Sequence, residues 1–248
     1  MLLHLPLFWL CMFGYSSAAS AVAHVAVAAN FSEPIKAIAA VLEKTTGHKL
    51  NITLGATGKL YAQITNGAPF DVLLAANADA PAQLENDGLT QASSRFTYAT
   101  GKLVLWSADE GKVDAKGEVL KSGNFRKIAY ASPKVAPYGK AAVQVMQKMG
   151  LTALLSPKLV QGESIGQTYT FIHTGNAELG FVALSQVLQG GRLKSGSMWV
   201  IPQAFYLPIR QDAVVLSRGA ANPAAQALVE LLKSPSIKDL IRSYGYSA

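Results

Sequence analysis

Four segments of the sequence lie where a helix is expected to begin, in three cases after an apolar run typical of a strand. They are centred on Asn30, Thr57, Tyr138 and Ile165. A helix N-terminus has free backbone N–H groups and the positive end of the helix dipole, so a turn of this kind binds an anion without any Lys or Arg. If several such turns face one cleft, we expect them to hold a small oxyanion.

The elements that position these turns follow from the hydrophobic periodicity. Apolar runs typical of strands alternate with segments of helical period from residue 25 onward, which predicts an α/β protein with largely parallel strands. The predicted strands are 25–29, 51–54, 72–75, 103–106, 128–131 and 213–216. The predicted helices are 34–46, 59–66, 80–87, 140–149, 167–176 and 224–233.

Composition and the first residues indicate an exported globular protein. Half of the 248 residues are hydrophobic and only 15% are charged, which argues against disorder. Residues 2–14 are almost all apolar, and the small residues of 16–23 that follow offer A-x-A cleavage sites, so we expect an export signal. A membrane anchor is the alternative, but the run is shorter than the roughly 20 residues that a spanning helix needs.

Cysteine, histidine and charge exclude several kinds of site. The single cysteine, Cys11, lies in the predicted signal, so the mature chain has no disulfide and no thiolate metal site. Bulky residues directly before Cys11 also disfavour a lipid anchor. The four histidines are far apart and lack the spacing of metal ligands. The net charge of +7 comes from scattered Lys and Arg, which favours attraction of anions and not a nucleic-acid groove.

One motif indicates a different function, an exported serine hydrolase that uses Ser164. Residues 162–166 fit the G-x-S-x-G pattern, in which a strained turn presents a nucleophilic serine to a histidine base. That fold requires an acid and then a histidine after the serine. His173 is the last histidine, and no Asp or Glu lies between it and Ser164. A helix start flanked by glycines is therefore the favoured interpretation, and the hydrolase remains an alternative.

Several motifs in the same order resemble the periplasmic molybdate-binding proteins that supply molybdate ABC importers. The matching segments cover nearly the whole mature chain and are 28–31, 55–64, 67–72, 133–139 and 179–183. The resemblance implies a type II periplasmic binding protein fold, in which two α/β lobes joined by crossing strands hold a ligand between them. The implied division is a signal peptide at 1–23, lobe 1 at 24–101 and 209–248, and lobe 2 at 102–208.

The resemblance also implies a function. The chain is expected to be a monomeric periplasmic carrier that binds molybdate and tungstate, delivers them to ABC permease subunits, and has no enzyme activity, cofactor or cation site. Carried over by position, Asn30 and Thr57 line the lobe 1 side of the cleft, and Tyr138 and Ile165 line the lobe 2 side. Many relatives have a tyrosine at the position of Ala183 and a small residue at that of Tyr138, so this chain departs from the common pattern.

The chemistry of the anion predicts a cage made only of donors. Molybdate is fully deprotonated at neutral pH and can only accept hydrogen bonds, so we expect donation from the Asn30 amide, the Thr57 hydroxyl and the backbone N–H groups of all four residues. A carboxylate in the cage would favour protonated phosphate, and only Glu33 and Glu163 are near the motifs. A carrier of sulfate or another oxyanion remains an alternative, and a ligand-sensing domain is a third.

Overall fold

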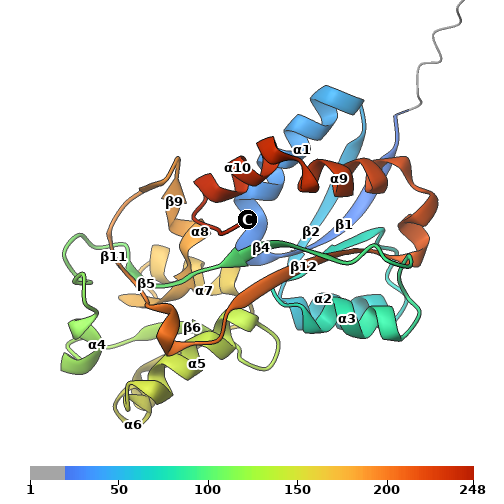
Figure 1. The fold of residues 1–248 in the computed structure, drawn as a ribbon. Helices are drawn as coiled ribbons and strands as arrows, with labels where there is room; N and C mark the ends of the chain where they lie inside the picture. The colour runs from blue at the N-terminus through green and yellow to red at the C-terminus, as the bar shows by residue number, and fades with distance from the viewer. Residues whose placement is uncertain (1–19) are drawn as a thin grey trace, which may run out of the picture.

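The strands of the computed structural model, which describes residues 20–248, form two five-stranded sheets and one two-stranded ribbon (Figure 1). The predicted export signal lies outside the described residues apart from 20–23. Within the described part, no helix combines the length and the apolar character needed to cross a membrane. We call each sheet with its helices a lobe, lobe 1 being the one that contains the first strand.

Lobe 1 is built on a mixed sheet of order β2-β1-β3-β12-β4. Its strands are β1 (Val22–Ala28), β2 (Lys49–Gly55), β3 (Val72–Leu74), β4 (Phe96–Gly101) and β12 (Ile209–Val215). Its helices are α1 (Ser32–Thr46), α2 (Thr57–Thr65), α3 (Asp79–Asn86), α9 (Pro223–Lys233) and α10 (Pro235–Ser243), with short 3-10 turns η1 (Ala29–Phe31) and η4 (Ser217–Ala221). Strand β1 runs parallel to β2 and β3, whereas β12 runs antiparallel to β3 and β4.

Lobe 2 is built on a second mixed sheet of order β11-β5-β8-β6-β7. Its strands are β5 (Leu103–Ser107), β6 (Ile128–Ala131), β7 (Leu159–Gly162), β8 (Leu179–Ala183) and β11 (Ser197–Val200), beside a small ribbon of β9 (Leu188–Gln189) and β10 (Arg192–Leu193). Its helices are α4 (Glu118–Ser122), α5 (Pro137–Lys148), α6 (Thr152–Leu155), α7 (Ile165–His173) and α8 (Leu184–Val187), with 3-10 turns η2 (Ser156–Lys158) and η3 (Gln203–Phe205).

Alternating side chains of the first strand explain the layers of lobe 1. Val25 and Val27 pack with α1, α9 and α10 in one apolar cluster, whereas Ala26 packs with Leu60 of α2 and Leu84 of α3 in another. Successive strand residues point to opposite faces of a sheet. Helices therefore cover both faces, as Figure 1 shows for α2 and α3 against α1, α9 and α10.

Two connections carry the chain between the sheets. The first is the step from β4 to β5 at Gly101–Lys102, and the second is the segment 201–208 between β11 and β12. Gly101 is required at its position, because an added Cβ would collide with the hydroxyl of Tyr138 from lobe 2. The crossing strands thus lie directly beside residues of both lobes.

The predicted fold class is confirmed, and two details are corrected. Half of the strand pairings in the two five-stranded sheets are antiparallel, because the crossing strands β5, β11 and β12 run against their neighbours. Strand β12 begins at Ile209, four residues before the predicted start at 213. The first half of β12 was not predicted because the polar residues Arg210–Asp212 interrupt the apolar pattern of the strand. In the structure Gln211 and Asp212 are nevertheless buried.

Candidate functional site

The four predicted site residues line one enclosed cavity between the lobes. Its volume is about 10 Å³, which is near the lower limit for one water-sized occupant. None of the lining residues is charged, and they are Ala28, Ala29, Asn30, Gly55, Ala56, Thr57, Ala76, Ala136, Pro137, Tyr138 and Ile165. Residues separated by more than a hundred positions in sequence therefore share one small space.

Backbone donors reach this cavity from both lobes. Thr57 is the first residue of α2, Tyr138 the second of α5 and Ile165 the first of α7. The N–H groups at these positions have no carbonyl partner within their own helix, and the positive ends of three helix dipoles meet here. This is the arrangement that binds small anions at helix N-termini.

The hydroxyl of Thr57 is held as an available donor. Its side chain is 1% exposed, and Oγ1 accepts a hydrogen bond of 2.9 Å from the backbone N–H of Ala76. A hydroxyl that accepts one bond still has its own hydrogen to donate. Thr57 can therefore supply a side-chain donor in addition to its backbone N–H.

Asn30 is held differently, within a buried polar network. Its amide Nδ2 donates to Gln211 Oε1 at 2.8 Å and to the hydroxyl of Tyr246 at 2.9 Å. Its backbone carbonyl accepts from Ser185 Oγ and from Tyr246, each at 2.8 Å. The predicted donation from the Asn30 amide to an anion requires the opposite orientation of the side chain.

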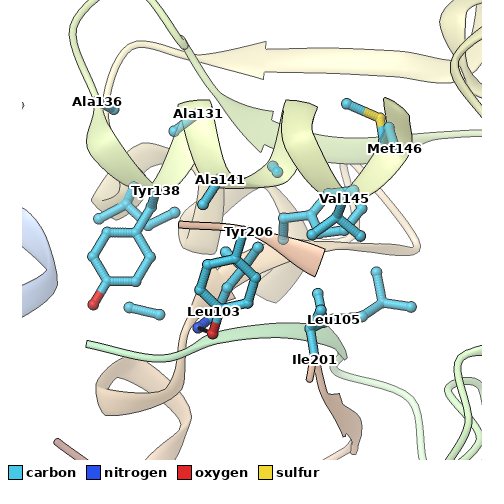
Figure 2. Packing of buried hydrophobic residues seen from close by; sticks show 14 of the residues in the cluster. Leu103, Leu105, Ala131, Ala136, Tyr138, Ala141, Val145, Met146, Ile201 and Tyr206 are labelled. Atoms are coloured by element: carbon cyan, nitrogen blue, oxygen red, sulfur yellow. Dashed lines mark hydrogen bonds between the residues drawn. The ribbon is translucent and has the colours of Figure 1, made fainter. Parts of the chain in front are cut away.

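The two residues from lobe 2 present backbone to the cavity. The ring of Tyr138 leaves the first turn of α5 beside Tyr206 and Leu103 (Figure 2), and its hydroxyl accepts from Gln211 Nε2 at 3.1 Å. The side chain of Ile165 is 4% exposed, and its carbonyl accepts from Gln186 Nε2 at 3.0 Å. The Tyr138 hydroxyl, which faces Gln211, still has its own hydrogen to donate, whereas the Ile165 side chain has none.

Burial keeps the tyrosines of the network neutral. Loss of hydration raises the pKa of Tyr98, Tyr138 and Tyr246 above the usual value for a phenol, because the charged phenolate is disfavoured away from water. All three therefore remain able to donate and accept hydrogen bonds throughout the neutral pH range. They do not add negative charge beside the cavity.

Contacts at the rim join the two lobes. The N–H of Gly58 donates to the carbonyl of Val135 at 2.9 Å, and a Cβ on Gly58 would lie 3.0 Å from Val135 Cα. Lys59 forms an exposed ion pair with Glu163, which lowers the pKa of that carboxyl through hydrogen bonding and charge. The described structure is therefore closed around the cavity.

Both acidic residues near the motifs point away from the cavity. Glu33 pairs with Lys36 on the surface, and Glu163 pairs with Lys59. Neither lines the cavity. Residues 20–248 also contain no group of three or more His, Cys, Asp or Glu that could hold a metal ion.

Ser164 acts as a helix cap in the structure. Its Oγ accepts from the backbone N–H of Gln167 at the start of α7, and His173 is the last residue of the same helix. A helix of nine residues separates its ends by about 12 Å. The hydroxyl and the imidazole are therefore not paired as nucleophile and base.

Sequence reasoning missed the residues that hold Asn30 in place. Gln211 on β12 is 181 positions from Asn30, and Tyr246 is 216 positions away. The one available signal was a pair of polar residues, Gln211 and Asp212, next to the apolar run 213–216. A polar side chain within a strand of a buried sheet indicates an internal hydrogen-bond partner.

Comparison with known proteins agrees with this architecture. Residues 23–247 match the model of the bacterial extracellular solute-binding proteins. The chain is 57% identical to the molybdate-binding protein ModA of Azotobacter vinelandii, over 93% of this chain and 91% of that one. It is 52% identical to ModA of Rhodobacter capsulatus, over 89% and 86%. The solved periplasmic molybdate-binding protein of A. vinelandii superposes with a TM-score of 0.88 at 40% identity, covering 90% of this chain and 98% of that one.

Proposed function

The chain belongs to the bacterial extracellular solute-binding proteins, and from this premise we propose that it captures molybdate, and also tungstate, for delivery to an ABC importer. The family is one of substrate-binding proteins and not of enzymes. The observation that carries the ligand assignment is the small uncharged cavity that all four helix-start segments line. Two relatives above 50% identity that are named for molybdate support it.

The cavity suits a ligand that only accepts hydrogen bonds. The Thr57 hydroxyl and the backbone N–H groups of Thr57, Tyr138 and Ile165 supply donors, and the helix dipoles add partial positive charge. Molybdate presents four acceptor oxygens and no proton at neutral pH. The hydrogen-bond donors of the cavity therefore match the acceptor oxygens of molybdate, and no cationic side chain is needed.

The closed cavity favours a small ion over an organic solute. Pockets for small organic molecules are typically about 300–1,000 Å³, far larger than the roughly 10 Å³ between these lobes. A tetrahedral oxyanion is larger than one water, so the walls must separate slightly as it enters. The two crossing connections provide the hinge for this movement.

Phosphate and sulfate are distinguished from molybdate on different grounds. Phosphate carries a proton at neutral pH and would need an acceptor; Glu33 and Glu163 are directed to the surface, so only the Asn30 amide oxygen could serve, and an amide turned with its N–H toward the ligand would not. Sulfate has the same charge and shape as molybdate with shorter bonds. The fit of the walls to the longer bonds of molybdate is thus the proposed basis for selection against sulfate.

Closure links ligand capture to delivery. Rim contacts such as Gly58 with Val135 form only when the lobes meet, so an enclosed anion and a closed outer surface arise together. A permease that recognises the closed surface would then accept loaded protein in preference to empty protein. We propose that delivery to the ABC permease depends on this coupling.

We retain the division into lobe 1 at 24–101 and 209–248 and lobe 2 at 102–208 as a proposal, together with export to the periplasm. The A-x-A sequences 19–21 and 21–23 offer two signal cleavage sites, and we favour the one after Ala21 in place of the expected boundary at residue 23. Strand β1 begins at Val22, and Ala23 is fully buried in it, so cleavage after Ala23 would shorten the strand. Mass spectrometry of the exported protein measures the new N-terminus directly.

A thermal-shift titration of the mature chain tests the function. Molybdate, tungstate, sulfate and phosphate are compared at fixed ionic strength. A ligand at a hundred times its dissociation constant adds about 2.7 kcal/mol of apparent stability. We expect stabilisation by micromolar molybdate and tungstate and none by millimolar sulfate. Stabilisation by sulfate alone would favour the sulfate carrier, and no shift with any anion would contradict the proposal.

A further inference from the structure

One buried polar atom of the site has no partner. Asn30 is 1% exposed, and both hydrogens of its amide are donated to protein groups. Its carbonyl oxygen Oδ1 is the only buried side-chain nitrogen or oxygen in residues 20–248 without a hydrogen bond. An unpartnered buried acceptor is rare and costly, and it lies on a residue that lines the cavity.

Gln211 joins this amide to the opposite wall. It is fully buried and lies where the register of β12 against β4 shifts, between Gln211 and Asp212. Its Oε1 accepts from Asn30 and from the hydroxyl of Tyr98 at 3.1 Å, and its Nε2 donates to Tyr138. A single side chain on a crossing strand therefore contacts a cavity residue from each lobe.

The same contacts allow a second arrangement of hydrogens. If the amides of Asn30 and Gln211 both rotate by half a turn, Gln211 Nε2 donates to Asn30 Oδ1 and Gln211 Oε1 accepts from Tyr138. Tyr246, which accepts from Asn30 Nδ2, then donates to Oδ1, and the Asn30 carbonyl keeps its bond from Ser185. Tyr98 can accept from Gln211, because its own hydrogen can go to the carbonyl of Ala75 at 3.0 Å. Hydroxyls can reverse their roles in this way, whereas each end of an amide has a fixed role.

The two arrangements differ in the atom of Asn30 that is left over. In the described arrangement it is an acceptor, and in the reversed one it is an N–H donor. We propose that Gln211 is a positioning residue for ligand specificity, which holds the Asn30 amide with its N–H toward the bound oxyanion. This inference rests on the proposed molybdate function and names a residue that acts on the ligand through Asn30.

Gln211→Glu tests the proposal, because a carboxylate can only accept. It would accept from the Asn30 amide and from Tyr138, and so leave Oδ1 as the free atom. We expect calorimetric titration near pH 8.5 to show molybdate binding about 100-fold weaker than in the wild type, the loss expected for a hydrogen bond to a charged group. The wild type should bind equally well from about pH 6.5 to 8.5, because molybdate has no proton to lose in this range and the site has no group that titrates there.

The pH profile separates positioning from simple damage. When the carboxyl introduced by Gln211→Glu is protonated, it regains one donor and can hold Asn30 as the wild-type amide does, so the affinity of the variant should recover as the pH falls. The titratable groups facing residue 211 are Tyr98 on β4, Tyr138 on α5 and Tyr246 near the C-terminus, which are neutral here. Asp212, the next residue, is bonded to Arg95 and Thr97.

Two further variants complete the test. Gln161→Glu adds the same charge at an exposed residue that accepts from Tyr130, a bond the carboxylate keeps, and should bind within about twofold of the wild type. Gln211→Met keeps the shape without hydrogen bonds, and should bind about tenfold more weakly with no pH dependence. It replaces Gln211→Glu if that variant does not fold.

The outcomes distinguish the two proposals. The role of Gln211 would be overturned if the wild type binds molybdate and Gln211→Glu binds it equally well. It would also be overturned if Gln211→Glu binds more weakly than the wild type by the same factor at about pH 6.5 and about pH 8.5. Wild-type affinity in Gln211→Met would overturn it as well. Absence of molybdate binding by the wild type would instead contradict the proposed function.

Discussion

The two walls of the cavity use different parts of the chain. Lobe 1 contributes polar side chains, Asn30 and Thr57, each fixed by hydrogen bonds to other protein groups. Lobe 2 contributes the backbone at the starts of α5 and α7, while the side chains of Tyr138 and Ile165 are buried away from solvent. The walls should therefore differ in their response to substitution, because most substitutions delete a side-chain donor, whereas only proline removes a backbone N–H.

The Asn30→Asp variant tests the lobe 1 wall most severely. It replaces an amide with an isosteric carboxylate beside a dianion, and like charges brought together cost several kcal/mol. We expect molybdate affinity to fall by about 1,000-fold or more, measured by calorimetry. Asn51→Asp, on the exposed side of β2, is the matched control and should bind as the wild type. Affinity within tenfold of the wild type in Asn30→Asp would place the anion elsewhere.

Thr57→Ala should have the next largest effect. It removes a hydroxyl donor and leaves the N–H of Ala76 without its acceptor. A hydrogen bond to a charged group contributes about 1.5–3 kcal/mol, so the dissociation constant should rise about 10- to 100-fold in the same titration. Thr57→Ser retains the hydroxyl and should remain within about threefold. Equal loss in both variants would show that packing, and not donation, is the role of Thr57.

Tyr138→Phe tests the contact between the walls. The hydroxyl of Tyr138 bonds Gln211 only where the lobes meet, so its loss affects the closed form. Either end of the Gln211 amide, left buried without its partner, costs about 1–3 kcal/mol, and we expect affinity about tenfold weaker. Tyr130→Phe in the same lobe, which loses a bond to Gln161, should leave binding unchanged. An unchanged Tyr138→Phe would mean that the hydroxyl does not stabilise closure.

The helix starts that line the cavity could be predicted from sequence because they are local features. A helix start needs only a few neighbouring residues, and the starts of α2 at Thr57, α5 at Pro137 and α7 at Ile165 lie within two or three residues of the predicted ones. Strands β1, β2 and β3 were also evident, since each is a short run bounded by turns. These features require no knowledge of the strand order.

The supporting network could not be predicted in the same way. Asn30, Gln211 and Tyr246 meet only because the last strands and the C-terminal residues return to lobe 1 after the whole of lobe 2. Strand β4 was missed because its sequence, FTYATG, mixes small and polar residues without clear alternation. Its pairing with β12, more than a hundred residues later, supplies the stability that the local pattern does not indicate.

Ile165→Val gives the smallest expected effect, and its comparison with Ile165→Pro gives the sharpest contrast between side chain and backbone. Ile165→Val removes one methylene and keeps the N–H, so binding should change by less than about twofold while unfolding costs about 0.5–1.5 kcal/mol less. Ile165→Pro removes the N–H at the first position of α7, where proline is tolerated and the extended backbone of Ser164 is compatible with it. It should weaken molybdate binding about 10- to 100-fold, as expected for loss of a donor to a charged group. If proline and valine bind equally well, the lobe 2 backbone is not a donor, and the asymmetry between the walls does not exist.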